Sequence, residues 1–139
     1  MGKKEPFEIF DPFDSISKDI LERLKKIKML TLDVDGVMTD GRILWIEGTG
    51  WTRSFHIRDG YGMKLLMKAG IDIALISGGD SKSVRERANF LGIKHVYLGD
   101  ENKIVALEKI LRDTGYMHDQ LAFMGDDLYD IPVLNAVGF

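Results

Sequence analysis

The chain has 139 residues, which is a common length for one domain. Hydrophobic residues make up 45% of the sequence, charged residues make up 29%, and the net charge is −3. This composition is typical of a soluble globular protein and excludes the strongly basic surface by which proteins bind nucleic acid. The absence of cysteine excludes disulfides, thiol catalysis and cysteine-bound zinc. We find no signal-peptide core near the start and no run long enough to span a membrane, so we expect a cytoplasmic protein.

The first part of the chain predicts an arm, a helix, a strand and a hairpin. Residues 1–28 are interpreted as an aperiodic N-terminal arm followed by a helix over 15–27, with Asp14 or Ser15 as its N-cap. Apolar residues at 29–33 predict a buried strand. The segments 42–47 and 51–57 flank Gly48-Thr49-Gly50, and this pattern predicts a β-hairpin over 42–56.

Beyond the hairpin, helices and strands alternate. Glycines end the predicted helices over 60–69, 81–91 and 102–113, and Pro132 fits the first turn of a last helix. Apolar runs predict strands over 71–77, 95–98 and 121–125. The pattern predicts an α/β, Rossmann-like fold with three layers, a central parallel sheet and a β-hairpin flap. The segments after the first two sheet strands are too short for a cap, so residues 29–139 are expected to form one capless domain.

Polar side chains follow the strands of the predicted sheet at the point where each strand ends. Asp33 and Asp35 close the first strand, and Ser77 closes the strand over 71–77. Asp126 follows the last strand, and Lys103 begins the helix after the strand at 95–98. Because ligands of such sheets bind beyond the carboxyl ends of the strands, we expect these side chains to form one site.

The carboxylates of this cluster suit magnesium and phosphoryl chemistry. Asp33 and Asp35 lie two residues apart and face the same way, and together with Asp126 they would repel one another without a cation among them. Oxygen ligands of this kind suit Mg²⁺, while Lys103 and Ser77 can hold phosphoryl oxygens. We predict Asp33 to be a nucleophile that forms an aspartyl-phosphate, and Asp35 to be the general acid and base.

The same residues leave other interpretations open. Each pattern is common alone, since an acidic pair often caps a turn, and only their joint occurrence at successive strand ends favours an active site. A signalling receiver domain also uses Asp, Ser or Thr, Lys and Mg²⁺, but its lysine comes last, whereas here an acidic cluster at 125–130 follows Lys103. A non-catalytic binding module with the same fold is a further alternative.

In this order, the four clusters resemble the motifs of the haloacid dehalogenase (HAD) superfamily of phosphohydrolases. The match consists of DVDG (33–36), Ser77, Lys103 and GDDLYD (125–130). The resemblance implies a bound Mg²⁺ with a supporting shell. The implied ligands are the side chains of Asp33 and Asp126 and the backbone carbonyl of Asp35, supported by Asp127 and Asp130.

Longer segments resemble the capless branch of this superfamily that includes the 3-deoxy-D-manno-octulosonate 8-phosphate (KDO 8-P) phosphatases. These segments are LDVDGVMTDG (32–41), FHIRDGYGMKLL (55–66), ISGGDSK (76–82), LGIKHVYLGDENK (91–103) and GDDLYDIPVL (125–134). The resemblance implies hydrolysis of the phosphate monoester of a 3-deoxy-2-keto sugar acid, as in lipopolysaccharide biosynthesis. The implied substrate-binding residues are Asp35, His56, Arg58, Asp59, Gly60, Lys64, Gly78, Arg87 and Lys103.

The resemblance also implies a homotetramer in which the hairpin of one subunit covers the active site of its neighbour. The aromatic residues Trp45, Trp51 and Phe55 of the predicted hairpin are expected to serve this contact. No nucleic acid or membrane partner is expected.

The sequence departs from this family in two places. Members usually have an arginine where this chain has Gly79, and we expect the missing side chain to leave room for a longer or differently oriented sugar acid. A nine-carbon sugar acid 9-phosphate is therefore an alternative substrate. Members also continue past the position of Phe139 into a strand, a helix and a glycine-rich tail, which this sequence is expected to lack.

Overall fold

The computed structural model describes residues 15–139, so the predicted arm and Asp14 lie outside the described residues. Within them, four parallel strands form a sheet in the order β5-β4-β1-β6. The strands are β1 (Met29–Leu32), β4 (Asp72–Ser77), β5 (His95–Leu98) and β6 (Leu121–Met124). The α-helices are α1 (Lys18–Lys26), α2 (Ile57–Lys68), α3 (Lys82–Leu91), α4 (Lys103–Thr114) and α5 (Ile131–Ala136). Short 3-10 helices, η1 (His118–Gln120) and η2 (Leu128–Asp130), flank β6.

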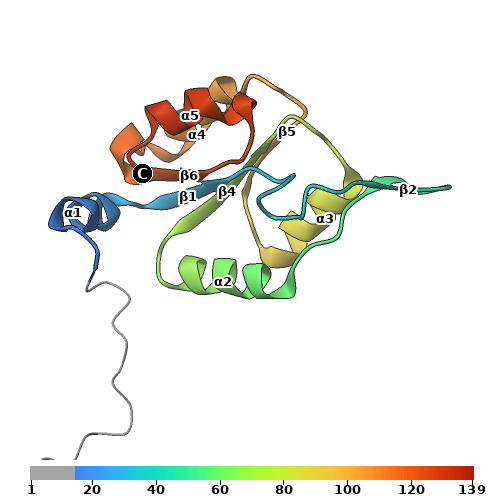
Figure 1. Ribbon diagram of the computed structural model, residues 1–139, viewed down its shortest axis with the longest axis horizontal. Helices are drawn as coiled ribbons and strands as arrows, with labels where there is room; N and C mark the ends of the chain where they lie inside the picture. Colours follow the sequence, from blue (N-terminus) through green and yellow to red (C-terminus); the bar gives the residue numbers. More distant parts are fainter. Residues whose placement is uncertain (1–14) are drawn as a thin grey trace, which may run out of the picture.

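The sheet separates two layers of helices (Figure 1). Successive side chains of a strand face opposite sides of a sheet. Ile73 and Leu75 of β4 therefore belong to the core cluster under α2 and α3, whereas Ala74 and Ile76 belong to the cluster under α4 and α5. Val34, between the two predicted catalytic carboxylates, is fully buried in the first cluster. This arrangement confirms the predicted three-layer α/β fold with a central parallel sheet.

Two helices begin at other residues than predicted. The first helix starts after Ser17, whose hydroxyl accepts a hydrogen bond from the backbone N–H of Ile20, so the prediction of Asp14 or Ser15 as its N-cap is wrong. α2 begins at Ile57 rather than at residue 60, because the side chain of His56 caps it by accepting from the backbone N–H of Arg58. Among the described residues, no helix has both the length and the apolar character that crossing a bilayer requires.

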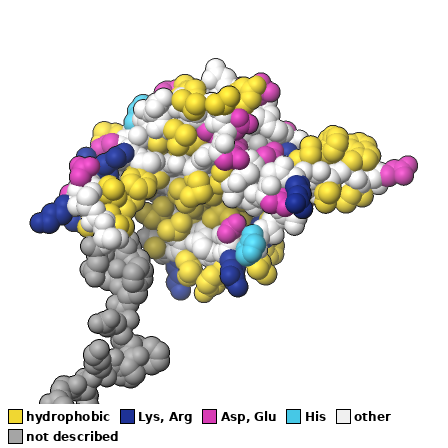
Figure 2. All heavy atoms as spheres, viewed as in Figure 1, with side chains coloured by type: hydrophobic (Ala, Val, Ile, Leu, Met, Phe, Trp, Pro, Cys, Tyr) yellow, Lys and Arg dark blue, Asp and Glu magenta, His cyan; other side chains and the backbone are white. Residues whose placement is uncertain are grey.

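The predicted hairpin is present and shorter than expected. β2 (Leu44–Ile46) pairs antiparallel with β3 (Gly50–Thr52). Trp45 and Trp51 face each other across the pair with ring centroids 5.2 Å apart, and they are 63% and 54% exposed. Figure 2 shows the hairpin as a hydrophobic projection from the body of the molecule. Phe55 does not join this exposed pair, because it packs partly buried against the core between the sheet and α2 and α3.

We expect the Leu107→Ala variant to lose about 2–5 kcal/mol of unfolding free energy, because Leu107 is fully buried and its truncation leaves a cavity under α4. Urea unfolding followed by circular dichroism measures this loss. The matched control is Leu65→Ala, which truncates a half-exposed leucine of α2 and should change stability by less than about 1 kcal/mol. Equal losses in the two variants would contradict the assigned core.

Candidate active site

The carboxyl ends of the parallel strands meet at one edge of the sheet. β1 lies between β4 and β6, and Leu32 is paired with Leu75 on one side and with Met124 on the other. The backbone N–H of Asp33 donates to the carbonyl of Met124 at 2.9 Å. The sheet therefore fixes Asp33 beside the loop that carries Asp126.

Lys103 lies at the centre of a buried network of charges. Its side chain is 5% exposed, and its ammonium donates to Oδ1 of Asp33 at 2.8 Å and to Oδ1 of Asp130. Burial raises the pKa of Asp33, and the hydrogen bond from Lys103 offsets only part of that rise. Burial alone would lower the pKa of Lys103, but its hydrogen bonds to Asp130 and Asp33 outweigh burial and raise that pKa. The lysine is therefore held as a cation between the two carboxyl groups.

Asp130 is fully buried and ties the lysine to the loop after β6. One of its oxygens accepts from Lys103, while Oδ2 accepts from the backbone N–H groups of Asp126 at 2.9 Å and of Asp127 at 3.0 Å. Gly125 makes room for this carboxylate, because a Cβ at that position would overlap the side chain of Asp130. The carboxylate thus sets the position of the loop that presents Asp126.

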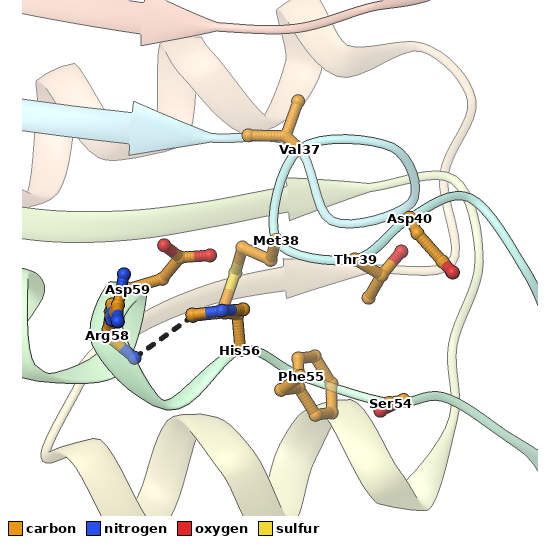
Figure 3. A pocket seen from close by; sticks show the side chains of 9 residues that line it. All are labelled: Val37, Met38, Thr39, Asp40, Ser54, Phe55, His56, Arg58 and Asp59. Carbon is orange, nitrogen blue, oxygen red and sulfur yellow. Dashed lines mark hydrogen bonds between the residues drawn. The ribbon is translucent and has the colours of Figure 1, made fainter.

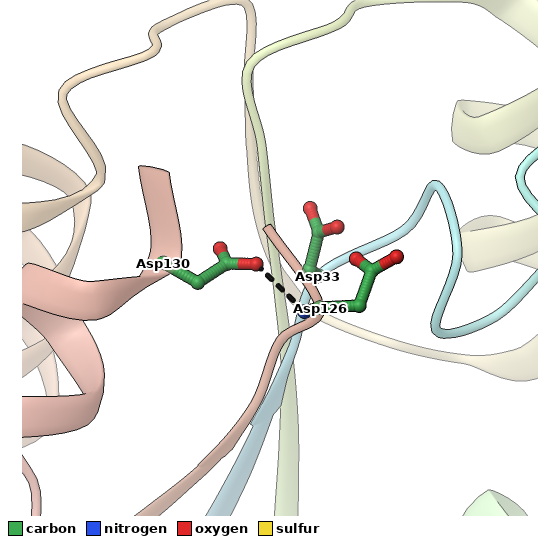
Figure 4. Close-up of side chains that lie close together, drawn as sticks. All are labelled: Asp33, Asp126 and Asp130. Atoms are coloured by element: carbon green, nitrogen blue, oxygen red, sulfur yellow. Dashed lines mark hydrogen bonds between the residues drawn. The ribbon is translucent and has the colours of Figure 1, made fainter. Parts of the chain in front are cut away.

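Asp33, Asp126 and Asp130 form a group of carboxylates suited to a metal ion (Figure 4). One oxygen from each lies within 4.8 Å of the others. Gly36 permits the approach, because it has the positive φ (+97°) that glycine adopts readily and because a Cβ there would overlap the Asp126 carboxylate. Oxygen donors of this charge fit Mg²⁺. Both oxygens of Asp130 already accept hydrogen bonds, from Lys103 and from the backbone N–H groups of Asp126 and Asp127, so its role in supporting the metal site stays a prediction.

The side chain of Asp35 is not part of this group, because it pairs with Arg53. Nε and Nη2 of the guanidinium donate to the two oxygens of Asp35, the second at 2.8 Å, and Nη1 donates to Oγ of Ser81 at 2.9 Å. The hydrogen bonds with Asp35 raise the pKa of Arg53. Metal ligation by the backbone carbonyl of Asp35 stays a prediction.

Arg53 is one residue of this site that the sequence interpretation missed. It also overturns an expectation about Gly79, since the space beside this glycine is occupied rather than free. A Cβ at Gly79 would lie 3.1 Å from Nη2 of Arg53, 3.7 Å from Oδ2 of Asp35 and 3.9 Å from Oγ of Ser77. The expected room for a longer sugar acid is therefore filled by the guanidinium. The sequence offered one signal: it has an arginine at position 53, in the hairpin segment, and lacks the usual arginine at position 79.

A small hollow of about 180 Å³ is lined by all four predicted catalytic residues. It is lined by Asp33, Asp35, Ser77, Gly78, Gly79, Glu101, Lys103, Asp127 and Tyr129. Asp127 also caps η2 through its side chain, which accepts from the backbone N–H of Leu128. The predicted nucleophile, acid and phosphoryl-binding groups thus share one opening, and Glu101 and Tyr129 are further side chains at its edge that the sequence did not single out.

A larger hollow of about 470 Å³ contains half of the remaining predicted substrate residues (Figure 3). Its lining includes His56, Arg58 and Asp59, together with residues of the 37–40 loop. One imidazole nitrogen of His56 accepts from the backbone N–H of Arg58 at 3.2 Å and so begins α2. The structure therefore places these three side chains around a shared cavity.

The other half of these residues, Gly60, Lys64 and Arg87, does not line that cavity. Gly60 is buried against Arg87, and a Cβ there would overlap its guanidinium. Nη2 of Arg87 donates to the carbonyl of His56 at 3.1 Å, and its guanidinium lies 5.7 Å from the ring centroid of Phe55. Lys64 stacks its ammonium 4.6 Å from the ring centroid of Phe90. In this structure Arg87 supports the segment that carries His56, and its contact with substrate stays a prediction.

Comparisons with known proteins agree with this geometry. No protein-family model matches the chain. The chain is 40% identical over 126 residues to a 3-deoxy-D-manno-octulosonate 8-phosphate phosphatase of Yersinia pestis, covering 91% of this chain and 67% of that protein. The crystal structure of the Yersinia pestis enzyme matches with a TM-score of 0.84 and 41% identity, over 88% of this chain and 66% of that one. The chain thus spans about two thirds of the length of these relatives.

A second solved structure bears on the ligands of the family. It is the 3-deoxy-D-manno-octulosonate 8-phosphate phosphatase of Moraxella catarrhalis in complex with a magnesium ion, a phosphate ion and KDO. The TM-score is 0.83 and the identity 36%, over 87% of this chain and 70% of that one. The identity, the coverage and the shared fold lead to one conclusion: the chain belongs to the KDO 8-P phosphatase family of the HAD superfamily.

Proposed function

We propose that this chain is a Mg²⁺-dependent phosphatase that hydrolyses KDO 8-P to KDO and inorganic phosphate. The observation that carries the proposal is the buried ammonium of Lys103 between Asp33 and Asp130, with the carboxylate of Asp126 beside them. Such a group of charges suits a phosphoryl-transfer centre, in which one carboxylate attacks phosphorus and a lysine and a metal neutralise the phosphate.

The residues divide the reaction into two steps. An oxygen of Asp33 attacks phosphorus, the bond from phosphorus to the sugar oxygen breaks, and Asp35 gives a proton to the departing oxygen. Asp35 then takes a proton from a water molecule, which attacks the aspartyl-phosphate and releases inorganic phosphate. Lys103 and Ser77 hold phosphoryl oxygens throughout. The side chains of Asp33 and Asp126 and the backbone carbonyl of Asp35 would hold Mg²⁺, with Asp130 as support, and the ion would supply the positive charge that lets a carboxylate approach a phosphate dianion.

The larger hollow beside this centre is the proposed place of the sugar acid. Arg58 and His56 line it, and an arginine can bind the carboxylate of a sugar acid through two parallel hydrogen bonds. A nine-carbon substrate was favoured only by the space expected beside Gly79. Since Arg53 fills that space, no observation now favours it over KDO 8-P.

We expect purified protein to release phosphate from KDO 8-P only when Mg²⁺ is present, and Asp33→Asn to lower kcat by about 10³-fold or more, because the amide is not a nucleophile. A malachite-green assay over a panel of sugar phosphates measures both effects. A hexose phosphate without a carboxylate is the substrate control. Turnover that survives EDTA, or an active Asp33→Asn variant, would contradict the mechanism.

Gly125→Ala tests whether Asp130 sets the metal loop. The added methyl group overlaps the Asp130 carboxylate, so we expect a Mg²⁺ affinity at least about tenfold weaker, as is common when groups that orient metal ligands are lost. Isothermal titration with Mg²⁺ gives the affinity. Gly62→Ala is the matched control, since no atom lies within 4 Å of a Cβ at that helical glycine. Equal affinities in the two variants would show that Asp130 is not the constraint.

We also infer a homotetramer of cytoplasmic enzyme subunits, with the hairpin at an interface. A two-stranded hairpin is marginally stable alone, yet this one exposes Ile43, Leu44, Trp45, Ile46 and Trp51. A second copy of the chain is the occupant best supported, because closed homo-oligomers bury self-complementary apolar surface and no separate cap covers the site within residues 15–139.

Multi-angle light scattering tests this assembly. The wild-type chain should elute with about four times the monomer mass, and the double variant Trp45→Glu, Trp51→Glu should shift toward the monomer because two charges replace the exposed indoles. Met117→Glu, which places a charge at another exposed apolar residue, is the control. A monomeric wild-type chain with full activity would overturn the inference.

A further inference from the structure

The side chain of Arg53 is mostly covered although the residue lies in the segment that leaves the hairpin. Its side chain is 8% exposed, and all three guanidinium nitrogens have partners, two on Asp35 and one on Ser81. Ser81 is itself fixed, because it caps α3 by accepting from the backbone N–H of Val84. A guanidinium removed from water this far is stable only while its partners hold it, so the fold defines its position.

Gly79 provides the space that the guanidinium occupies. This glycine does not have a positive φ, so backbone conformation does not require glycine here. A Cβ would lie 3.1 Å from Nη2 of Arg53, which is tighter than ordinary contact, and any longer side chain in that direction would collide with the guanidinium. The glycine and the hairpin arginine are therefore sterically matched.

The chain offers a second bidentate pair for comparison. Arg85 donates from Nε to Oδ1 of Asp80 at 2.8 Å and from Nη2 to Oδ2 of Asp80. That pair has the same geometry but is exposed, with half of the arginine side chain in solvent. The Arg53–Asp35 pair differs in its burial and in its carboxylate, which lines the catalytic hollow.

We propose that Arg53 is a residue that positions the side chain of Asp35. It extends from the segment after the hairpin into the space that Gly79 leaves open. The inference rests on the proposed function, in which Asp35 carries the proton to the departing sugar oxygen and from the attacking water. Two parallel hydrogen bonds fix the plane of the carboxylate, and the bond to Ser81 anchors the guanidinium to the start of α3. The hairpin thereby controls the direction in which the acid and base points.

The test compares Arg53→Ala, Arg53→Lys, Gly79→Ala and the double variant Arg53→Ala, Gly79→Ala. Arg53→Ala should lower kcat for KDO 8-P by about 10–100-fold with KM changed less than about threefold, because general acid–base catalysis contributes about 10²–10⁴-fold. Arg53→Lys should recover only part of kcat, since an ammonium lacks the planar fork. Gly79→Ala should lower kcat several-fold in the wild type and not at all in the Arg53→Ala background. Arg85→Ala is the matched control and should keep wild-type activity.

p-Nitrophenyl phosphate separates positioning from a general structural defect. Its leaving group departs without a proton, so the rate of the p-nitrophenolate burst should change less than about threefold in Arg53→Ala. An equal loss on both substrates, an unchanged kcat for KDO 8-P, or additive effects of Arg53→Ala and Gly79→Ala would each overturn the proposal.

The experiment also distinguishes this proposal from the proposed function. A wild-type chain that turns over p-nitrophenyl phosphate and an alkyl phosphate but not KDO 8-P would overturn the substrate alone, and the same variants then test Arg53 on the alkyl phosphate. A chain without any phosphatase activity would overturn the function. In that case a double-mutant cycle measured by thermal unfolding tests whether Arg53 and Gly79 are sterically matched. Shifts in Tm of Arg53→Ala and Gly79→Ala that are not additive support the match, and additive shifts overturn it.

Discussion

The ammonium of Lys103 lies out of water between Asp33 and Asp130, and a buried charge of this kind is stable only while both of its partners hold their positions. The three residues come from the end of β1, the start of α4 and the end of η2. The strand order β5-β4-β1-β6 brings those three points together at one edge of the sheet. The network therefore ties the catalytic centre to the global topology, because a shift of any of these elements would leave a buried charge without its partner.

A second network joins the hairpin to the same centre. Arg53 connects the end of the hairpin with Asp35 on the loop after β1 and with Ser81 at the start of α3. The two networks are built on different parts of the fold. Lys103 belongs to the helices and strands of the central sheet, whereas Arg53 belongs to the segment that follows the projecting hairpin. The predicted nucleophile, Asp33, is thus fixed by the core of the domain, and the predicted acid and base, Asp35, is held by a residue of the hairpin segment.

The sequence predicted the sheet and the strand-end residues because both depend on local patterns. The apolar run of β4, the glycine stops after the helices and the carboxylates at strand ends are all visible without coordinates. The start of α2 was missed because histidine is an uncommon N-cap, and the start of α1 because two nearby serines could each cap it. Arg53 was missed for another reason, since strand alternation does not say which loop a long side chain reaches.

Gly79 shows why an absent side chain is a weak guide to specificity. A missing arginine suggests an empty space when each position is considered alone, yet the space beside Gly79 holds the guanidinium of a residue 26 positions earlier in the chain. The guanidinium places a positive charge near Asp35 and Ser77, and this charge comes from the hairpin segment rather than from the sheet edge. Because Arg53 belongs to the hairpin segment, its guanidinium is positioned correctly only when the hairpin is positioned correctly. In this chain, therefore, the geometry of the acid and base depends on whatever holds the exposed hairpin in position.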